Sequence, residues 1–456
     1  MTIATGATPP VTLDVGVHTI TLTVTDNEGA SASDTVVVTV GAGALVAGVE
    51  FRVNDDITFN QGSPNVAVLN DGNFVIAYAG NNADANMHGV VARLYDPAGN
   101  PLTDEFIVNT GVADDQYAPS VSALDDGGFV VTWTSNLQDG SGLGVYGQRY
   151  DALANPVGAE FWVNTTTQRS QASSEVATLA DGGFVVTWNS WFQDGNKWGV
   201  YGQRFDDQGA PVGGEFQANM VTSRDQAVPQ VAALTDGGFV LVWHSDRQDG
   251  SSYAIIGRRY DALGNPVADE FQINSFTSGF QGYPHVTALA DSGFVVTWHS
   301  DGQDGSGWGV YGRRYDGAGD PAGGEFRVNP DTLNHQAGTR MTTLTDGGFV
   351  VAWGAFDGSL WRTFARRYTA DGVAMGDKFQ ISDATNTAGL RPRLAPTPDG
   401  GFVITWHSPD GDEKGAFARV FAPGTGGGAA SVTSLDTPQG SHPGRGLGTR
   451  GDFANK

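Results

Sequence analysis

The sequence has no cysteine and few basic residues. Its 456 residues include 50 acidic and 25 basic side chains, which gives a net charge of −25. The absence of thiols excludes disulfide bonds, thiol catalysis and cysteine-ligated zinc. The acidic balance argues against nucleic acid or an anionic membrane surface as a partner, because few cations are available to neutralise phosphates.

Long hydrophobic runs are also missing. No apolar stretch approaches the roughly 20 residues of a membrane-spanning helix, so we expect no membrane insertion. Residues 1–10 have neither a basic start nor an apolar core, so no signal peptide is expected there. No segment shows a helical period, and the 65 glycines interrupt any run long enough for a helix. The composition therefore favours a β protein.

The chain is built from one repeated unit. The Asp of a DGG-type turn recurs at intervals of 55 residues and, at the end, 53, at Asp71, Asp126, Asp181, Asp236, Asp291, Asp346 and Asp399. A fixed period of this length indicates a solenoid, a propeller or an array. In the fourth copy, turns separate four strand-like runs at 229–234, 238–243, 254–261 and 270–274. Four antiparallel strands in about 50 residues are typical of a propeller blade, so the sequence predicts an all-β, seven-bladed β-propeller with four-stranded antiparallel blades.

The phase of the repeat predicts how the ring closes. The motif EF-x-VN occurs at 50–54, before the first complete copy, and no EF-x-VN follows the last copy. If this motif is the outermost strand, the last blade lacks one strand, and residues 50–54 can fill the gap and remove an open edge. The alternative, with EF-x-VN innermost, needs no such closure.

Two sets of repeated residues are predicted to have structural roles. An aromatic residue ends the second strand of every copy, and burying such rings between blades supplies much of the contact between them. An Arg precedes Tyr in the third strand, and a Glu precedes Phe in the fourth, as in Arg149 and Glu160. Because these residues recur in most blades, we interpret them as cross-strand pairs rather than as chemistry.

Segments on either side of the repeats have a different character. Residues 11–41 contain two alternating runs joined by a turn at 26–29, and they resemble the closing hairpin of a PKD domain, an immunoglobulin-like module. We predict a partial Ig-like hairpin at 1–41, a linker at 42–48, the propeller at 49–422 and a disordered Gly-rich tail at 423–456. The tail contains Arg450-Gly451-Asp452, for which we expect no integrin role.

The wording of the repeat, QDGSGxGVYGQRYDAxGxPVGxEFxVN, resembles repeats of very large secreted or surface-anchored bacterial proteins of the RTX and adhesin type. This resemblance implies an extracellular or cell-surface location and a role as a monomeric interaction module. The strand order is also similar to that of sialidase-type propellers. The sialidase Asp-box S-x-D-x-G-x-x-W and the RTX motif GGxGxDxUx are both absent, which puts sialidase activity and an RTX calcium site in doubt.

The loops after the second strands provide the candidate site. Four consecutive blades carry an aromatic four residues after a loop Asp, namely Trp198 after Asp194, Tyr253 after Asp249, Trp308 after Asp304 and Trp361 after Asp357. Three blades carry a His directly after the core Trp, among them His244 and His299, which we interpret as turn or surface residues. Flat rings stack on sugars, and Asp and His bond to hydroxyls, so this face is predicted to bind a glycan or a cell-surface protein. The alternative is that the rings pack against neighbouring blades and each Asp caps its turn.

The strict period also bears on catalysis. A catalytic propeller needs one blade that differs from the others, and no inserted loop is visible, so we predict no catalytic residues and a binding or adhesion module. Two alternatives remain open: a polysaccharide lyase or glycoside hydrolase, which would have one deep central pocket, and a structural spacer in a long surface protein. We expect no cofactor; the alternative is calcium at the acidic spots 26–28 and 410–413, although one Asp per loop is fewer carboxylates than calcium prefers.

Overall fold

The structure is a computed structural model. It describes residues 45–55, 60–81, 87–111, 114–382, 392–409 and 414–424, together with the backbone of three strands at 16–25, 31–40 and 430–432. The chain forms two compact units, one of residues 45–423 and one of residues 1–44 with 424–456. In the smaller unit, β1 (Gly16–Thr25) and β2 (Ser31–Val40) form an antiparallel hairpin, and β32 (Ala430–Val432) adds to β2 as a third strand.

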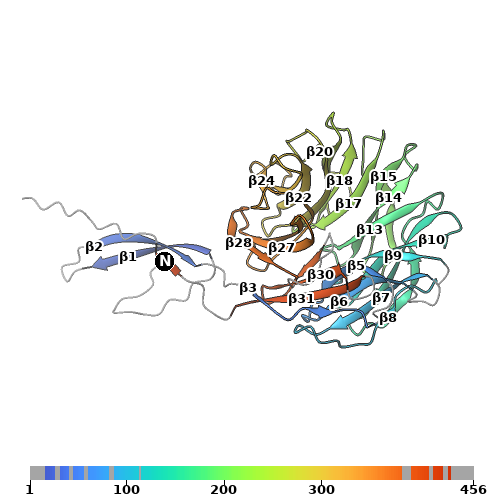
Figure 1. Cartoon of the computed structure of the whole chain (residues 1–456), viewed down its shortest axis with the longest axis horizontal. Helices are drawn as coiled ribbons and strands as arrows, with labels where there is room; N and C mark the ends of the chain where they lie inside the picture. The colour runs from blue at the N-terminus through green and yellow to red at the C-terminus, as the bar shows by residue number, and fades with distance from the viewer. Residues whose placement is uncertain are drawn as a thin grey trace, which may run out of the picture. The chain divides into compact units, whose positions relative to one another are not determined.

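The larger unit is a seven-bladed β-propeller, as the period predicted (Figure 1). The innermost strands are β5 (Gln61–Val68), β9 (Gln116–Ala123), β13 (Gln171–Thr178), β17 (Gln226–Ala233), β21 (Gln281–Ala288), β25 (Gln336–Thr343) and β29 (Arg393–Pro396). The second strands are β6 (Phe74–Asn81), β10 (Phe129–Asn136), β14 (Phe184–Trp191), β18 (Phe239–Asp246), β22 (Phe294–Asp301), β26 (Phe349–Phe356) and β30 (Phe402–Ser408). The third strands are β7 (His88–Tyr95), β11 (Leu143–Tyr150), β15 (Trp198–Phe205), β19 (Tyr253–Tyr260), β23 (Trp308–Tyr315), β27 (Trp361–Tyr368) and β31 (Gly415–Pro423). The outermost strands of the first six blades are β8 (Phe106–Ile107), β12 (Pro156–Trp162), β16 (Pro211–Gln217), β20 (Phe271–Gln272), β24 (Phe326–Arg327) and β28 (Ala374–Gln380).

The N-terminal strand of the propeller closes the ring, which confirms that EF-x-VN is outermost. In the seventh blade, β31 pairs with β3 (Leu45–Ala47) and β4 (Phe51–Arg52), so that Phe51 lies opposite Ala418. The amide of Ala416 donates to Asn54 Oδ1 at 2.8 Å, and in the first blade the amide of Val90 donates to Asn109 in the same way. The alternative with EF-x-VN innermost is wrong.

The DGG turns begin each second strand in the same way. Asp126 Oδ1 accepts the amide of Gly128 at 2.9 Å, and Gly127 has φ 88°, a conformation that glycine adopts without steric cost. A Cβ on Gly128 would lie 2.1 Å from the carbonyl oxygen of Tyr150, so a side chain there would push the third strand away. This glycine therefore lets the third strand lie close to the start of the second, and only in the first blade does another residue, Asn73, take its place.

The predicted aromatic core is confirmed. The Trp residues that were expected at the second strands are at most 1% exposed, and Tyr78 replaces them in the first blade at 2%. Each apolar cluster joins neighbouring blades; one, for example, contains Ala77 of the first blade and Trp133 of the second. Tyrosines of the third strands add polar links, because the Tyr315 hydroxyl donates to the carbonyl of Ile273 in the preceding blade at 3.1 Å. Apolar side chains buried between neighbouring blades therefore hold the ring together.

The predicted pairing of the repeated Arg and Glu is wrong. Arg149 pairs instead with Asp126 of the DGG turn in its own blade, with Nη2 and Oδ2 3.0 Å apart, and the third to sixth blades repeat this contact. The Glu reaches back to the preceding blade, where Glu160 Oε2 accepts the amide of Thr110 at 2.7 Å. The Glu is therefore a link between blades, because the outer strand places it over the loop that follows the preceding blade rather than beside the Arg.

The sixth blade departs from this pattern in a consistent way. Pro330 stands where Thr110 stands in the first blade, and proline has no amide hydrogen to donate to a Glu. Lys378 replaces the Glu there and pairs with the Asp331 carboxylate. An ion pair between Lys378 and Asp331 thus replaces the hydrogen bond between Glu and the backbone amide, and the link between blades is preserved.

Candidate functional site

The four predicted aromatic residues occupy equivalent positions. Trp198, Tyr253, Trp308 and Trp361 are each the first residue of a third strand and lie opposite the last residue of the second strand. All four are half-buried. The positions are equivalent, but their surroundings are not.

Tyr253 and Trp308 belong to one continuous cluster, which we call the aromatic patch, made up of Tyr253, Phe280, Tyr283, His299 and Trp308. Ring centroids are 5.3 Å apart between Tyr253 and Phe280, 6.2 Å between Phe280 and Tyr283, and 4.9 Å between Tyr283 and His299. His299 then stacks on Trp308 at 5.2 Å with an angle of 15° between the rings. Four of the five rings are half-buried and His299 is buried, so the patch presents partly exposed faces from the fourth and fifth blades.

The other two aromatic residues lie in separate local groups. Trp198 packs edge-on against Trp191 with centroids 5.0 Å apart, and Trp361 lies 5.4 Å from Phe356. In both cases the partner is the residue directly opposite on the neighbouring strand. The structure therefore assembles one patch rather than four equivalent sites.

The predicted histidines are in strands, not in turns. His244 and His299 are only 7% and 3% exposed, in β18 and β22, so their interpretation as turn or surface residues is wrong. The physical reason is that the second strand continues three residues past the core Trp. In another blade the equivalent Asn189 accepts the amide of Val228 at 3.0 Å, which shows that this position supports the inner strand of the next blade.

The predicted loop aspartates make turn contacts. Asp194 Oδ1 accepts the amide of Asn196 at 3.0 Å, and Asp249 and Asp304 accept amides two residues later in the same way. Asp194 Oδ2 and Asp249 Oδ2 also accept from the buried Asn219 and Asn274 side chains. Each Asp thus has the geometry of a turn cap and has at least one carboxylate oxygen engaged within its own blade.

The sequence reasoning missed a second feature, the mouth of the central channel. A pocket of about 350 Å³ opens there, and its wall includes Glu175, Gln230, Arg340, Arg393 and His407. Each innermost strand contributes one equivalent residue, and these residues differ among the first five blades and are arginine in the last two: Asn65, Ser120, Glu175, Gln230, His285, Arg340 and Arg393. A β-bulge precedes this position, as between Ala227 and Gln230, where Val228 has φ 56°. Such bulges re-aim a side chain next to functional sites.

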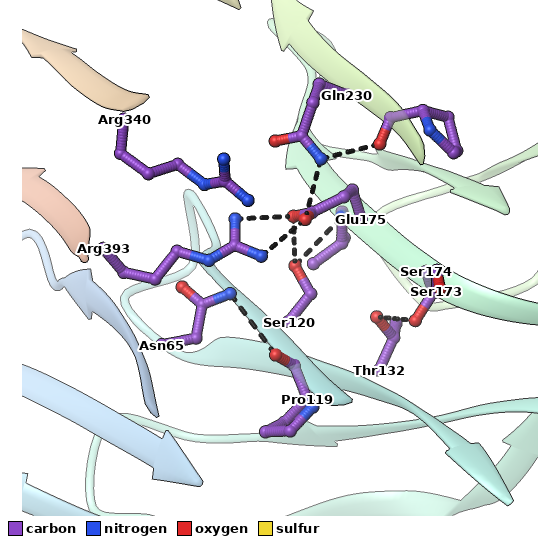
Figure 2. Close-up of polar contacts among 12 residues, drawn as sticks. Asn65, Pro119, Ser120, Thr132, Ser173, Ser174, Glu175, Gln230, Arg340 and Arg393 are labelled. Atoms are coloured by element: carbon purple, nitrogen blue, oxygen red, sulfur yellow. Dashed lines mark hydrogen bonds and ion pairs between the residues drawn. The ribbon is translucent and has the colours of Figure 1, made fainter. Parts of the chain in front are cut away.

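Glu175 is the centre of a polar network across the channel (Figure 2). Arg393 donates to both of its oxygens, at 2.6 and 3.2 Å, and Gln230 and Ser120 donate at 2.9 and 3.1 Å. Burial alone would raise the pKa of Glu175, but the charges and hydrogen bonds of Arg393, Arg340 and Gln230 outweigh it and hold the pKa below its usual value. The carboxylate is therefore ionised at neutral pH.

His285 is neutral in the same ring. Its burial, together with the positive charges of Arg340 and Arg393, lowers the pKa of His285 well below its usual value. Arg340 is 4% exposed, and Figure 2 shows it and Arg393 pointing toward Glu175 from adjoining blades. The described channel wall therefore holds two positive charges and one negative charge.

The sequence does contain a pattern that could have indicated the channel pocket. In the inner-strand pattern P-x-V, the flanking Pro and Val each recur in five of the seven copies, while the middle residue changes in nearly every copy. A position that varies inside an otherwise uniform repeat is the asymmetry that a single site on a propeller requires.

Comparison with known proteins gives the fold and no family. No family model matches the chain, and no curated protein matches it. Among solved structures, a protein of unknown function from Dyadobacter fermentans is similar over 83% of this chain and 99% of its own, at 10% identity and a TM-score of 0.51. The polysaccharide lyase Uly1 has 9% identity over 81% of this chain and 91% of its own, with a TM-score of 0.49. The propeller domain of the Trilobed protease from Pyrococcus furiosus has 9% identity over 79% and 94%, with a TM-score of 0.45. At these identities the first likeness supports the fold alone, and the other two carry no argument.

Within the described ranges, no group of three or more His, Asp or Glu side chains is arranged to hold a metal ion. The acidic spots at 26–28 and 410–413 and the sequence Arg450-Gly451-Asp452 lie outside the described residues. No helix in the described part of the chain is long and apolar enough to cross a membrane.

Proposed function

We propose that this protein is an extracellular or cell-surface recognition module, non-enzymatic and monomeric, that binds carbohydrate at one asymmetric site on the propeller. The observation that carries the proposal is the aromatic patch. Its rings form a connected and partly exposed surface from Tyr253 to Trp308, whereas Trp198 and Trp361 each pack against only a local partner. Partly exposed rings of this kind stack on the apolar faces of sugar rings.

The position of Tyr283 supports the same proposal. It is the bulge residue of the fifth inner strand, with φ 51°, and its counterparts Ser63, Ala118, Ser173 and Val228 line the channel pocket. The patch therefore begins at the channel rim, where polar groups are concentrated. Flat apolar surface beside a few convergent polar groups is the usual composition of a small-ligand site.

A glycan array tests the proposal. Trp308→Ala removes the outer ring of the patch, and we expect it to lower binding by about tenfold or more, because a stacked aromatic contributes roughly 1.5 kcal/mol beyond simple contact area. Trp162→Ala is the matched control, since Trp162 is 57% exposed on the outermost strand β12. If no glycan binds, or if both variants bind as the wild type does, the patch is not the site and a spacer role is favoured.

The channel pocket favours a second candidate, a polysaccharide lyase or glycoside hydrolase. Arg340, Arg393 and His407 converge on one central pocket, which is the feature that separates an enzyme from a shallow repeated face. Against a glycosidase, Glu175 is the only carboxylate among the described residues that line the pocket, and such enzymes ordinarily use two. A lyase would release unsaturated sugars from an acidic polysaccharide, detectable by ultraviolet absorbance. Product formation that Arg393→Gln abolishes would replace binding with catalysis.

A further inference from the structure

We propose that the channel mouth binds the carboxylate group of an acidic sugar, so that the ligand of the module is a hexuronic-acid-containing glycan. This inference deepens the proposed function and rests on it. It assigns a role to the variable ring of inner-strand residues, which the aromatic patch leaves unexplained.

The charge of the pocket is the first argument. Arg340 and Arg393 supply two positive charges to its wall, and Glu175 supplies one negative charge. The described wall is thus positive by one charge in a chain whose net charge is −25. Electrostatic attraction is stronger in a partly enclosed site than at the open surface. The positive pocket can therefore attract an anion even though the protein as a whole is acidic.

The donor chemistry is the second argument. Guanidinium groups present a planar fork of donors that matches a carboxylate, and the Arg393 fork already holds one carboxylate in this way, that of Glu175. Ser174, Gln230 and the bulge residue Ser173 also line the pocket and can bond to sugar hydroxyls. Its volume of about 350 Å³ is at the small end of ligand sites, which suits one sugar residue rather than a folded peptide.

The nearby aromatic patch selects among anions. An inorganic anion or free acetate would use the arginines but not Tyr283, whereas a sugar acid can place its carboxylate in the channel and its ring, or the next sugar, against the patch. The two features together therefore favour an acidic saccharide.

Calorimetric titration of the full chain tests this inference. The probes are trigalacturonate, its methyl ester, the neutral trisaccharide of galactose, and acetate and sulfate as simple anions. We expect trigalacturonate to bind, the ester and the neutral sugar to bind at least tenfold more weakly, and added salt to weaken only the acidic probe. Arg340→Gln is expected to raise the Kd for trigalacturonate about tenfold or more. Arg327→Gln, a change of equal charge on the exposed strand β24, is expected to leave it unchanged.

The outcomes separate the inference from the proposed function. Equal binding of the acidic and neutral probes, with no effect of Arg340→Gln but a loss in Trp308→Ala, overturns the carboxylate site and leaves glycan binding intact. Acetate or sulfate binding as tightly as trigalacturonate also overturns it, since the site would then hold any small anion. If Arg340→Gln does not fold, the affinity of the wild type for the methyl ester and the salt dependence of its binding to trigalacturonate still test the carboxylate site. Binding of neither trisaccharide overturns the carboxylate site, and the glycan array then decides the proposed function separately.

Discussion

Replacing Glu175 by Gln removes the negative charge at the centre of the channel and should destabilise the whole propeller. The side chain is nearly isosteric, so packing is retained while the charge is lost. Glu175 lies in the third blade and Arg393 in the seventh, and their side chains are 14% and 21% exposed. The change leaves Arg340 and Arg393 facing each other without the carboxylate that they surround.

The expected cost is about 3 kcal/mol. Removing one partner of a buried ion pair costs roughly 3–5 kcal/mol, and the lower value applies here because the channel is open at its mouth. Ser120→Ala is a useful comparison, since it removes only the 3.1 Å hydrogen bond to the same carboxylate and should cost about 1 kcal/mol. The double variant Glu175→Gln with Arg393→Gln should recover part of the loss, because one of the two neighbouring positive charges is removed as well.

Urea unfolding followed by tryptophan fluorescence measures these differences, and urea is preferred because the ions of guanidinium chloride would screen the pair. The folded-state pKa of Glu175 is depressed, so its contribution is fully present above the unfolded value of about 4.3 and is lost as pH falls through the folded value. The gap between wild type and Glu175→Gln should therefore be full at pH 7 and shrink below about pH 4. A gap under about 0.5 kcal/mol at pH 7, or one independent of acid pH, refutes the role of the network.

Two further predictions concern other positions. The pKa of His285 is held low, so the unfolded chain binds a proton that the folded chain does not, and the free energy of unfolding falls as pH drops below about 6.5. His285→Gln should reduce this loss of stability between pH 7 and pH 5 by up to about 2 kcal/mol. An unchanged pH profile of stability would contradict this prediction. Lys378→Glu should lower the free energy of unfolding in urea by about 1 kcal/mol, because Asp331 would repel the new carboxylate and Pro330 has no amide hydrogen to donate to it. Adding Pro330→Thr and Asp331→Thr restores the pattern of the other blades and should recover that loss. Failure of the triple variant to recover would show that the sixth blade departs from its neighbours for another reason.

The period of the sequence determined the fold. A repeated unit with four strand-like runs buries its faces against copies of itself, so seven copies predict a ring, and the position of EF-x-VN at 50–54 predicts one of two ways in which that ring closes. The core aromatics could be identified for the same reason, because a residue such as Trp243 recurs at one strand position in almost every blade. The core aromatic residues that recur in the copies are those that pack between neighbouring blades.

Tertiary structure alone decided which residues meet. Arg149 and Glu160 were placed together by their strand positions, yet the pleat and the twist of the blade turn Arg149 to the DGG turn and Glu160 to the preceding loop. Glu175 and Arg393 are 218 residues apart and come together only because the closed ring brings every inner strand to one axis. Tyr253 and Trp308 are joined by Phe280 and Tyr283 for a related reason, since loops of successive blades share one face. Local pattern specifies each blade, but contacts across the channel and between blades depend on the distances that only closure of the ring sets.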